Sequence, residues 1–119
     1  MSPQPGETEK VVRHHLKAFV EQQGLDAILA DYADDACFLS EGCAWCGKAA
    51  IREFFDHFIA GLPPGAIGDF TLRSLRAHGD VAYITWSAGI DLPLGTDTFV
   101  VRHGRIVSQT FAMYGLSGH

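Results

Sequence analysis

Apolar positions change their spacing along the chain. In the first half they recur every three or four residues, which is the period of an amphipathic helix. This spacing predicts helices at residues 7–23, 25–32 and 48–60. A short apolar run predicts a strand at 36–40, and the segment 41–47 is expected to be a loop. The second half alternates with a period of two, which predicts strands at 68–77, 81–88, 96–102 and 105–114.

Helices followed by a four-strand meander predict an α+β domain, with helices packed on a mainly antiparallel sheet. Both faces of that sheet carry apolar residues. One face is expected to hold Phe99, Val101, Phe111 and Met113, and the other Ile84, Trp86, Val100 and Ala112. One set packs under the helices, and the other needs a cover. The simplest cover is a second subunit, so we expect a homodimer through the sheet.

Composition narrows the class of protein. The 119 residues suit one domain, expected at 7–119 after a flexible arm at 1–6. A net charge of −5 without a basic cluster argues against a nucleic-acid partner. No long apolar run is present, so we expect no membrane partner and a cytoplasmic location. Three cysteines, an odd number, favour a reducing compartment over a disulfide framework.

Asp97 is the most informative residue of the predicted strand 96–102. Side chains alternate along a strand, so Asp97 shares a face with Phe99 and Val101. A carboxylate on an apolar face costs several kcal/mol unless it is paired, hydrogen-bonded or protonated. A functional pocket is one explanation. The alternative is a strand-end residue that turns outward or caps a tight turn at Gly95.

Four stretches of the chain resemble one family. They are residues 25–29, 32–36, 47–55, and 97–99 together with 104–108. In order and spacing they are similar to the nuclear transport factor 2-like superfamily, which includes ketosteroid isomerase and the SnoaL-like polyketide cyclases. The resemblance implies a cone-shaped α+β roll, with three N-terminal helices on a curved sheet that encloses a pocket. It says less about the reaction, because this fold hosts enzymes and binding modules alike.

The resemblance also implies roles for particular positions. The isomerases use a strand Asp as base, a helix Tyr, and a protonated Asp that donates to the developing enolate. The protonated Asp falls at Asp97. The other family positions are occupied here by Ser40 (beside Glu41), Leu16 (beside His15), Phe55 and Tyr32. Only one of the three catalytic groups is present at its family position, so ketosteroid isomerase activity is not expected.

Candidate site residues follow from the strand pattern and the family register together. The catalytic candidates are Asp97, Glu41 and His15, although Glu41 is also consistent with a solvated loop and His15 with a helix edge. Further pocket residues are expected among the aromatic and hydroxyl side chains, the alternative being a core with satisfied hydroxyls. They are Leu16, Tyr32, Ser40, Trp45, Phe54, Phe55, Phe58, Tyr83, Thr85, Ser87, Phe99, Gln109, Phe111 and Tyr114.

Other motifs add little chemistry. Cys43 and Cys46 lack nearby histidines for a zinc site, and a pocket-rim loop is favoured over a redox role. No metal or cofactor is expected. The leading hypothesis is a protein that binds a small hydrophobic, carbonyl-bearing molecule, with isomerase, cyclase or dehydratase chemistry at Asp97. The alternative is a ligand carrier or dimeric accessory protein, whose cone would be filled by Phe54, Phe55, Phe58 and Phe111.

Overall fold

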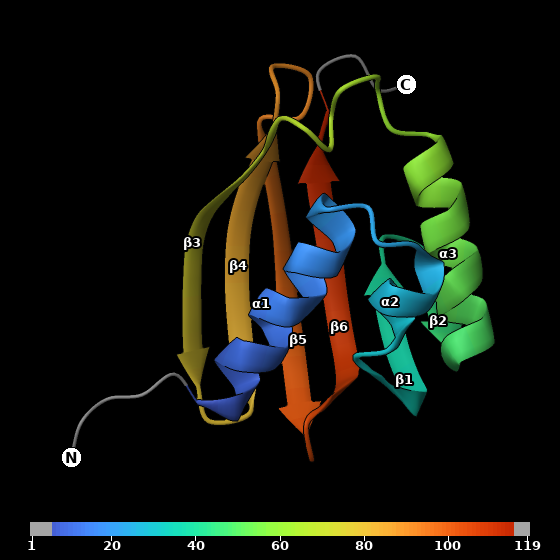
Figure 1. The fold of residues 1–119 in the computed structure, drawn as a ribbon, viewed down its shortest axis with the longest axis vertical. Helices are drawn as coiled ribbons and strands as arrows, with labels where there is room; N and C mark the ends of the chain where they lie inside the picture. The colour runs from blue at the N-terminus through green and yellow to red at the C-terminus, as the bar shows by residue number, and fades with distance from the viewer. Residues whose placement is uncertain (1–5, 116–119) are drawn as a thin grey trace.

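The computed structural model describes residues 6–115, in which helices pack on one face of a six-stranded sheet (Figure 1). The helices are α1 (Glu7–Val20), α2 (Leu25–Leu29) and α3 (Lys48–Ala60). The strands are β1 (Tyr32–Ser40), β2 (Cys43–Cys46), β3 (Phe70–His78), β4 (Val81–Ala88), β5 (Leu94–Arg102) and β6 (Arg105–Tyr114). This arrangement confirms the predicted α+β class. All but Gly6 of the predicted arm lies outside the described residues.

The sheet joins the two halves of the chain. Its strand order is β2-β1-β6-β5-β4-β3, and β1 pairs parallel with β6 whereas the other neighbours are antiparallel. The early strand β1 therefore lies between β2 and the last strand, β6 (Figure 1). Beyond β6, the sheet continues through β5 and β4 to β3. Both α1 and α3 lie over the same face of this sheet (Figure 1).

Several predicted boundaries in the first half are wrong, and α1 ends at Val20 instead of residue 23. Tyr32 begins β1 instead of ending the second helix, and β1 includes the exposed pair Asp34 and Asp35. The segment expected to be a loop at 41–47 contains the strand β2. The cause is a tight turn at Gly42, whose φ of 82° brings β2 back along β1.

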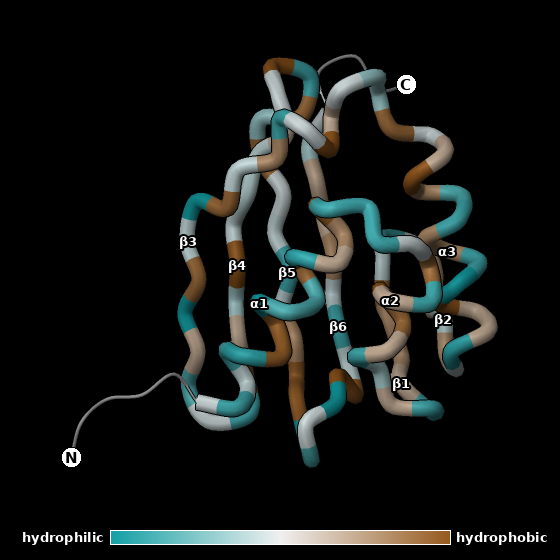
Figure 2. Tube along the Cα trace, in the orientation of Figure 1, coloured by the Kyte–Doolittle hydropathy of each residue, from teal (hydrophilic) through white to brown (hydrophobic). Residues whose placement is uncertain are grey.

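The face of the sheet toward the helices, here called the inner face, holds the core. Apolar positions alternate with polar ones along the strands, as the colours of β3 show in Figure 2. Ile84 pairs directly with Asp97 and Ala82 with Phe99, so β4 and β5 present these residues on the same face. Ile84 and Trp86 are buried there. Their expected place on the face opposite Phe99 is therefore wrong, because the cross-strand register, which the sequence pattern lacks, decides the face.

Among residues 6–115, the three helices lie over the inner face and none covers the opposite, outer face (Figure 1). It carries the cross-strand pairs Tyr83 with Thr98, Thr85 with Thr96, and Thr98 with Thr110. Apolar side chains at its margins are exposed, including Val81, Leu94 and Tyr114 at 44%, 47% and 61%. The outer face is thus uncharged at its centre and open in the isolated chain.

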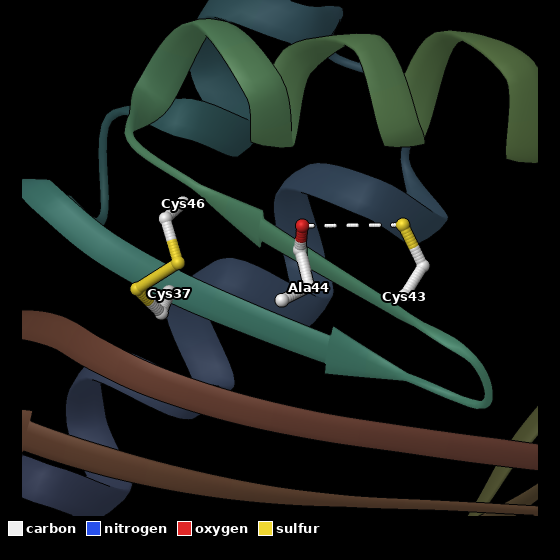
Figure 3. The surroundings of a disulfide bond; sticks show 4 residues. All are labelled: Cys37, Cys43, Ala44 and Cys46. Atoms are coloured by element: carbon white, nitrogen blue, oxygen red, sulfur yellow. Dashed lines mark hydrogen bonds between the residues drawn. A yellow bond between two sulfur atoms is a disulfide. The ribbon is translucent and has the colours of Figure 1, made fainter.

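Two of the three cysteines form a disulfide between the first two strands. Cys37 of β1 and Cys46 of β2 are directly opposite in register and are bonded (Figure 3). Cys43, at the other end of β2, is free and exposed. The expectation that the cysteines do not form disulfides is therefore corrected. The pairing depends on the β2 hairpin, which the sequence pattern did not predict.

Candidate functional site

A cavity lies between the helices and the inner face, and its free space is about 50 Å³. Its wall is mostly aromatic and aliphatic. The polar side chains on it are His15, Trp86, Asp97 and Gln109. The other lining residues are Leu16, Phe19, Phe38, Phe54, Phe55, Phe58, Leu62, Ala66, Ile67, Phe70, Ile84, Ala88, Leu92, Phe99 and Phe111. A few placed polar groups in an apolar wall are typical of a small-molecule site.

Asp97 projects from the middle of β5 into this wall and is 7% exposed. Its Oδ1 accepts a hydrogen bond from Trp86 Nε1 and its Oδ2 accepts one from Gln109 Nε2, both at 2.8 Å. Burial raises the pKa of Asp97 to about 6, and the two hydrogen bonds oppose that rise. The carboxylate is therefore the main form at pH 7. Two N–H donors suit an ionised Asp97, whereas the resemblance implied a neutral, donating one.

The Gln109 amide is held from its other side by Tyr32. The Tyr32 hydroxyl donates to Gln109 Oε1, and both residues are buried. Burial raises the pKa of Tyr32 well above its usual value, and the charges of Asp97 and Asp31 add to this rise. Tyr32 therefore stays a neutral donor. It orients Gln109 so that the amide nitrogen faces Asp97.

Trp86 reaches Asp97 because its cross-strand partner is Gly95. A Cβ built at Gly95 would lie 2.1 Å from Trp86 Cε2, so the indole lies flat against the glycine backbone. The ring also stacks on Phe70, with centroids 5.4 Å apart. Sequence reasoning missed this role and treated Gly95 as a turn residue. A glycine inside a strand, which often marks a close approach, was the available signal.

His15 comes from α1 and is 3% exposed. Its ring meets the rings of Tyr32, Phe55 and Phe99 edge-on, with centroids 5.4, 6.0 and 5.7 Å away. Burial lowers the pKa of His15 to about 4, and the charge of Asp31 acts in the opposite direction. The imidazole is therefore neutral at pH 7. The position of His15 on the cavity wall excludes the alternative of a helix edge.

The structure brings together about half of the expected site. Lining the cavity are His15, Leu16, Phe54, Phe55, Phe58, Asp97, Phe99, Gln109 and Phe111. Tyr32 lies behind the wall, bonded to Gln109. Besides Trp86, sequence reasoning missed the lining residues Phe19, Phe38, Leu62, Ala66, Ile67, Phe70, Ile84, Ala88 and Leu92. Several of these come from strand ends and from the segment after α3, where no periodic pattern marks a wall.

The hydroxyl-bearing stripe of β4 is on the wrong side of the sheet for the cavity. Since Ile84 faces Asp97 on the inner face, its neighbours Tyr83 and Thr85 point outward, and Ser87 follows them. Tyr83 is 43% exposed. The expected contribution of these three residues to the pocket is therefore wrong.

Four other expected residues also lie off the cavity. Glu41 is exposed in the turn between β1 and β2. The Ser40 hydroxyl accepts a hydrogen bond from Trp45 Nε1 at 3.3 Å, and Trp45 packs on Phe54 behind the wall. Tyr114 is exposed at the end of β6. The β1–β2 hairpin carries the first three away from the cavity, so Glu41 is not placed to assist Asp97.

Across residues 6–115, no group of three or more His, Cys, Asp or Glu side chains is arranged to hold a metal ion. In the same residues, no helix has the length and apolar character needed to cross a membrane. The polar chemistry of the cavity therefore comes from His15, Trp86, Asp97 and Gln109.

The helices, the curved sheet and the enclosed polar cluster define a cone-shaped α+β protein with an internal cavity. The chain belongs to the SnoaL-like domain family, whose model matches residues 12–109. A search of curated proteins finds no match.

Solved structures share the nuclear transport factor 2-like fold at low sequence identity. A protein of this fold from Burkholderia xenovorans LB400 is 19% identical, with a TM-score of 0.75 over 95% of this chain and 87% of its own. A putative polyketide cyclase from Sinorhizobium meliloti is 20% identical, with a TM-score of 0.69 over 87% and 94%. A hypothetical protein with a ketosteroid isomerase-like fold from Catenulispora acidiphila, in complex with trimethylamine, is 16% identical, with a TM-score of 0.71 over 91% of this chain and 87% of its own. These likenesses establish the fold.

Proposed function

We propose that the cavity binds a small apolar molecule carrying a carbonyl, and that Asp97 acts as a base on the carbon beside that carbonyl. The observation that carries this proposal is a buried carboxylate, held by two N–H donors, on an otherwise apolar cavity wall. A base is most effective when its pKa lies near the working pH. The pKa of Asp97, about 6, meets that condition.

The proposed step moves one proton and one electron pair. Asp97 takes the proton from the carbon, and the electrons of that C–H bond form an enolate whose charge lies on the carbonyl oxygen. An amide nitrogen has two N–H donors. Gln109 gives one to Asp97, which leaves the other for this oxygen. Return of the proton to a different atom completes an isomerisation. Attack of the enolate on a second carbonyl completes a cyclisation when the new alkoxide takes the proton back from Asp97. Loss of a β-hydroxyl, which leaves as water with that proton, completes a dehydration.

The size of the cavity limits the ligand. About 50 Å³ is well below the roughly 150 Å³ of an apolar cavity that binds benzene. A ring therefore enters only if wall side chains move. Phe54 and Phe58 are half-buried and stacked on each other, with centroids 5.4 Å apart. They are the side chains that a ligand would displace.

The same packing favours a second candidate, a non-catalytic accessory protein. Phe58 and Phe54 reach Phe111 across the cavity, with ring centroids 5.3 and 5.9 Å apart. A cone filled by its own side chains needs no ligand. Against this candidate stands the energetic cost of keeping two ionisable groups, Asp97 and His15, in that interior.

Both candidates include a homodimer through the outer face. The supporting observation is that no helix of the described residues covers that face, which also carries exposed apolar side chains such as Tyr83. The relatives lend general support to a small-molecule site, since one structure of this fold is a complex with trimethylamine. The cytoplasmic location and the absence of nucleic-acid and membrane partners remain predictions from the sequence.

The test is exchange of the protons beside the carbonyl of cyclopentanone in D₂O, followed by NMR. The wild-type protein should accelerate exchange, with a rate that rises with pH through about 6 as Asp97 ionises. Asp97→Asn should reduce the acceleration about 100-fold or more. Asp91→Asn, which removes an exposed carboxylate, should not change it. Ligand-induced shifts at Phe54 and Phe58 without exchange would indicate a carrier, and no shifts at all would favour the filled cone.

A further inference from the structure

Within residues 6–115, His15 Nδ1 is the buried side-chain nitrogen or oxygen that lacks a hydrogen-bond partner. Its neighbours are the rings of Tyr32, Phe55 and Phe99, none of which offers a strong donor at this distance. A buried unsatisfied polar atom is rare in folded proteins, because the desolvation cost of the group is not recovered. The ring also lines the cavity, so a bound molecule is a natural partner for this nitrogen.

The neutral imidazole offers one donor and one acceptor. The backbone of Ile28 raises the pKa of His15, which is the effect of a carbonyl toward which the ring directs an N–H. Because Nδ1 has no partner, we assign this N–H to Nε2, which leaves a free lone pair on Nδ1. His15 thus presents an acceptor toward its surroundings.

Asp97 presents the same polarity. Both of its oxygens accept hydrogen bonds from the protein, and in the ionised form neither has a proton to give. The cavity therefore contains two acceptors, Asp97 and His15, in a wall that is otherwise apolar apart from Gln109 and Trp86. A ligand with only carbonyl oxygens would leave His15 Nδ1 unpaired.

We infer that the cavity selects a molecule that carries a hydroxyl or N–H donor in addition to the carbonyl, and that His15 Nδ1 accepts that hydrogen bond. The inference rests on the proposed binding function and narrows its substrate class to compounds that carry a hydroxyl, enol or N–H donor besides the carbonyl. An analogue without this donor should bind more weakly, because it would leave the buried His15 Nδ1 without a hydrogen bond.

The test compares phenol with toluene, which have nearly equal size and differ in one O–H donor. Phenol should bind the wild-type protein about tenfold more tightly than toluene, measured by NMR titration. In His15→Phe the ratio of the two affinities should fall to about one. His57→Phe, the same substitution at an exposed position of α3, should leave the preference unchanged. The ¹⁵N shifts of the His15 ring should show Nδ1 unprotonated in the free protein and hydrogen-bonded with phenol.

Stability gives a readout that separates recognition from a structural role. His15→Phe removes the desolvation cost of Nδ1 but also removes the ring donor to Ile28, so if Nδ1 is reserved for a ligand, Tm in the absence of ligand should change by less than about 4 °C. A fall in Tm with an unchanged phenol preference would overturn the inference, as would a protonated Nδ1.

The two proposals fail in different ways. Equal binding of phenol and toluene would sink the role of His15 and leave Asp97 as a candidate base. If the phenol preference survives His15→Phe but disappears in Asp97→Asn, the acceptor of the phenol O–H is Asp97 and not His15. Binding of neither phenol nor toluene, together with no cyclopentanone-induced shifts at Phe54 and Phe58, would remove the ligand-binding function itself, and the inference with it.

Discussion

The inner and outer faces of the sheet carry polar side chains at the same alternating spacing but use them differently. On the inner face, Asp97, Gln109 and Trp86 are buried and bonded to one another. On the outer face, Thr98 and Thr110 lie among residues open to solvent. The alternation of polar and apolar residues along a strand therefore does not show which polar residues form a binding site. The difference lies in whether each polar atom has a fixed partner away from water.

The largest effect is expected where the inner face has no space. Gly95→Ala would place a Cβ inside the indole of Trp86, forcing the ring away and breaking its bond to Asp97. Overpacking and the lost charged hydrogen bond together should lower the free energy of unfolding by about 3 kcal/mol or more, measured by urea denaturation. Thr98→Ala, on the outer side of the same strand, should cost about 0.5 kcal/mol. Equal losses would contradict the distinction between the two faces.

The second prediction concerns two opposing pH dependences of the inner face. The folded pKa of Asp97 is raised to about 6, so its ionisation destabilises the fold as pH rises from about 4 to 6. The folded pKa of His15 is lowered to about 4, so protonation of the unfolded chain destabilises the fold as pH falls from about 6.5 to 4. Each effect amounts to roughly 3 kcal/mol, and in the wild-type protein they largely cancel.

Single variants should reveal each dependence separately. Asp97→Asn should become more stable as pH rises from 4 to 6.5, because the His15 contribution remains. His15→Phe should become less stable over the same range, because the Asp97 contribution remains. Urea denaturation at several pH values measures both. Parallel curves for the two variants would show that these groups do not carry the pH dependence.

The smallest effect on subunit stability is expected on the outer face. Thr98→Arg would place a charge at the centre of the proposed dimer interface, where a second copy would bury it without a partner. The variant should be monomeric in analytical ultracentrifugation and keep an Asp97 pKa of about 6, measured by NMR titration. A wild-type protein that is already monomeric at about 100 μM would remove the dimer from the proposal.

The sequence was sufficient to predict the fold class and the position of Asp97 on a pocket wall, because both depend on local patterns and on the family resemblance. It was not sufficient for the faces of the sheet. A period of two defines two faces but not which one the helices cover, so Tyr83 and Thr85 were placed in the pocket. The pairing of Ile84 with Asp97, a contact between separate strands, decides that question.

Long-range register also explains the other differences. The Cys37–Cys46 bond requires β2 to fold back from Gly42 in a specific alignment. The role of Trp86 depends on a glycine in the neighbouring strand. His15 was a candidate because its position lies beside the apolar stripe of α1, but its missing partner is visible only in three dimensions.

The Gln109 amide links three strands in a fixed polarity. Its oxygen faces Tyr32 of β1 and its nitrogen faces Asp97 of β5. An amide is asymmetric, so these two ends cannot change roles independently. If Asp97 were to gain a proton and donate it to Gln109, the amide would have to turn over, and the Tyr32 hydroxyl would become the acceptor. The protonation state of Asp97 on β5 therefore determines whether the Tyr32 hydroxyl on β1, two strands away, donates or accepts its hydrogen bond.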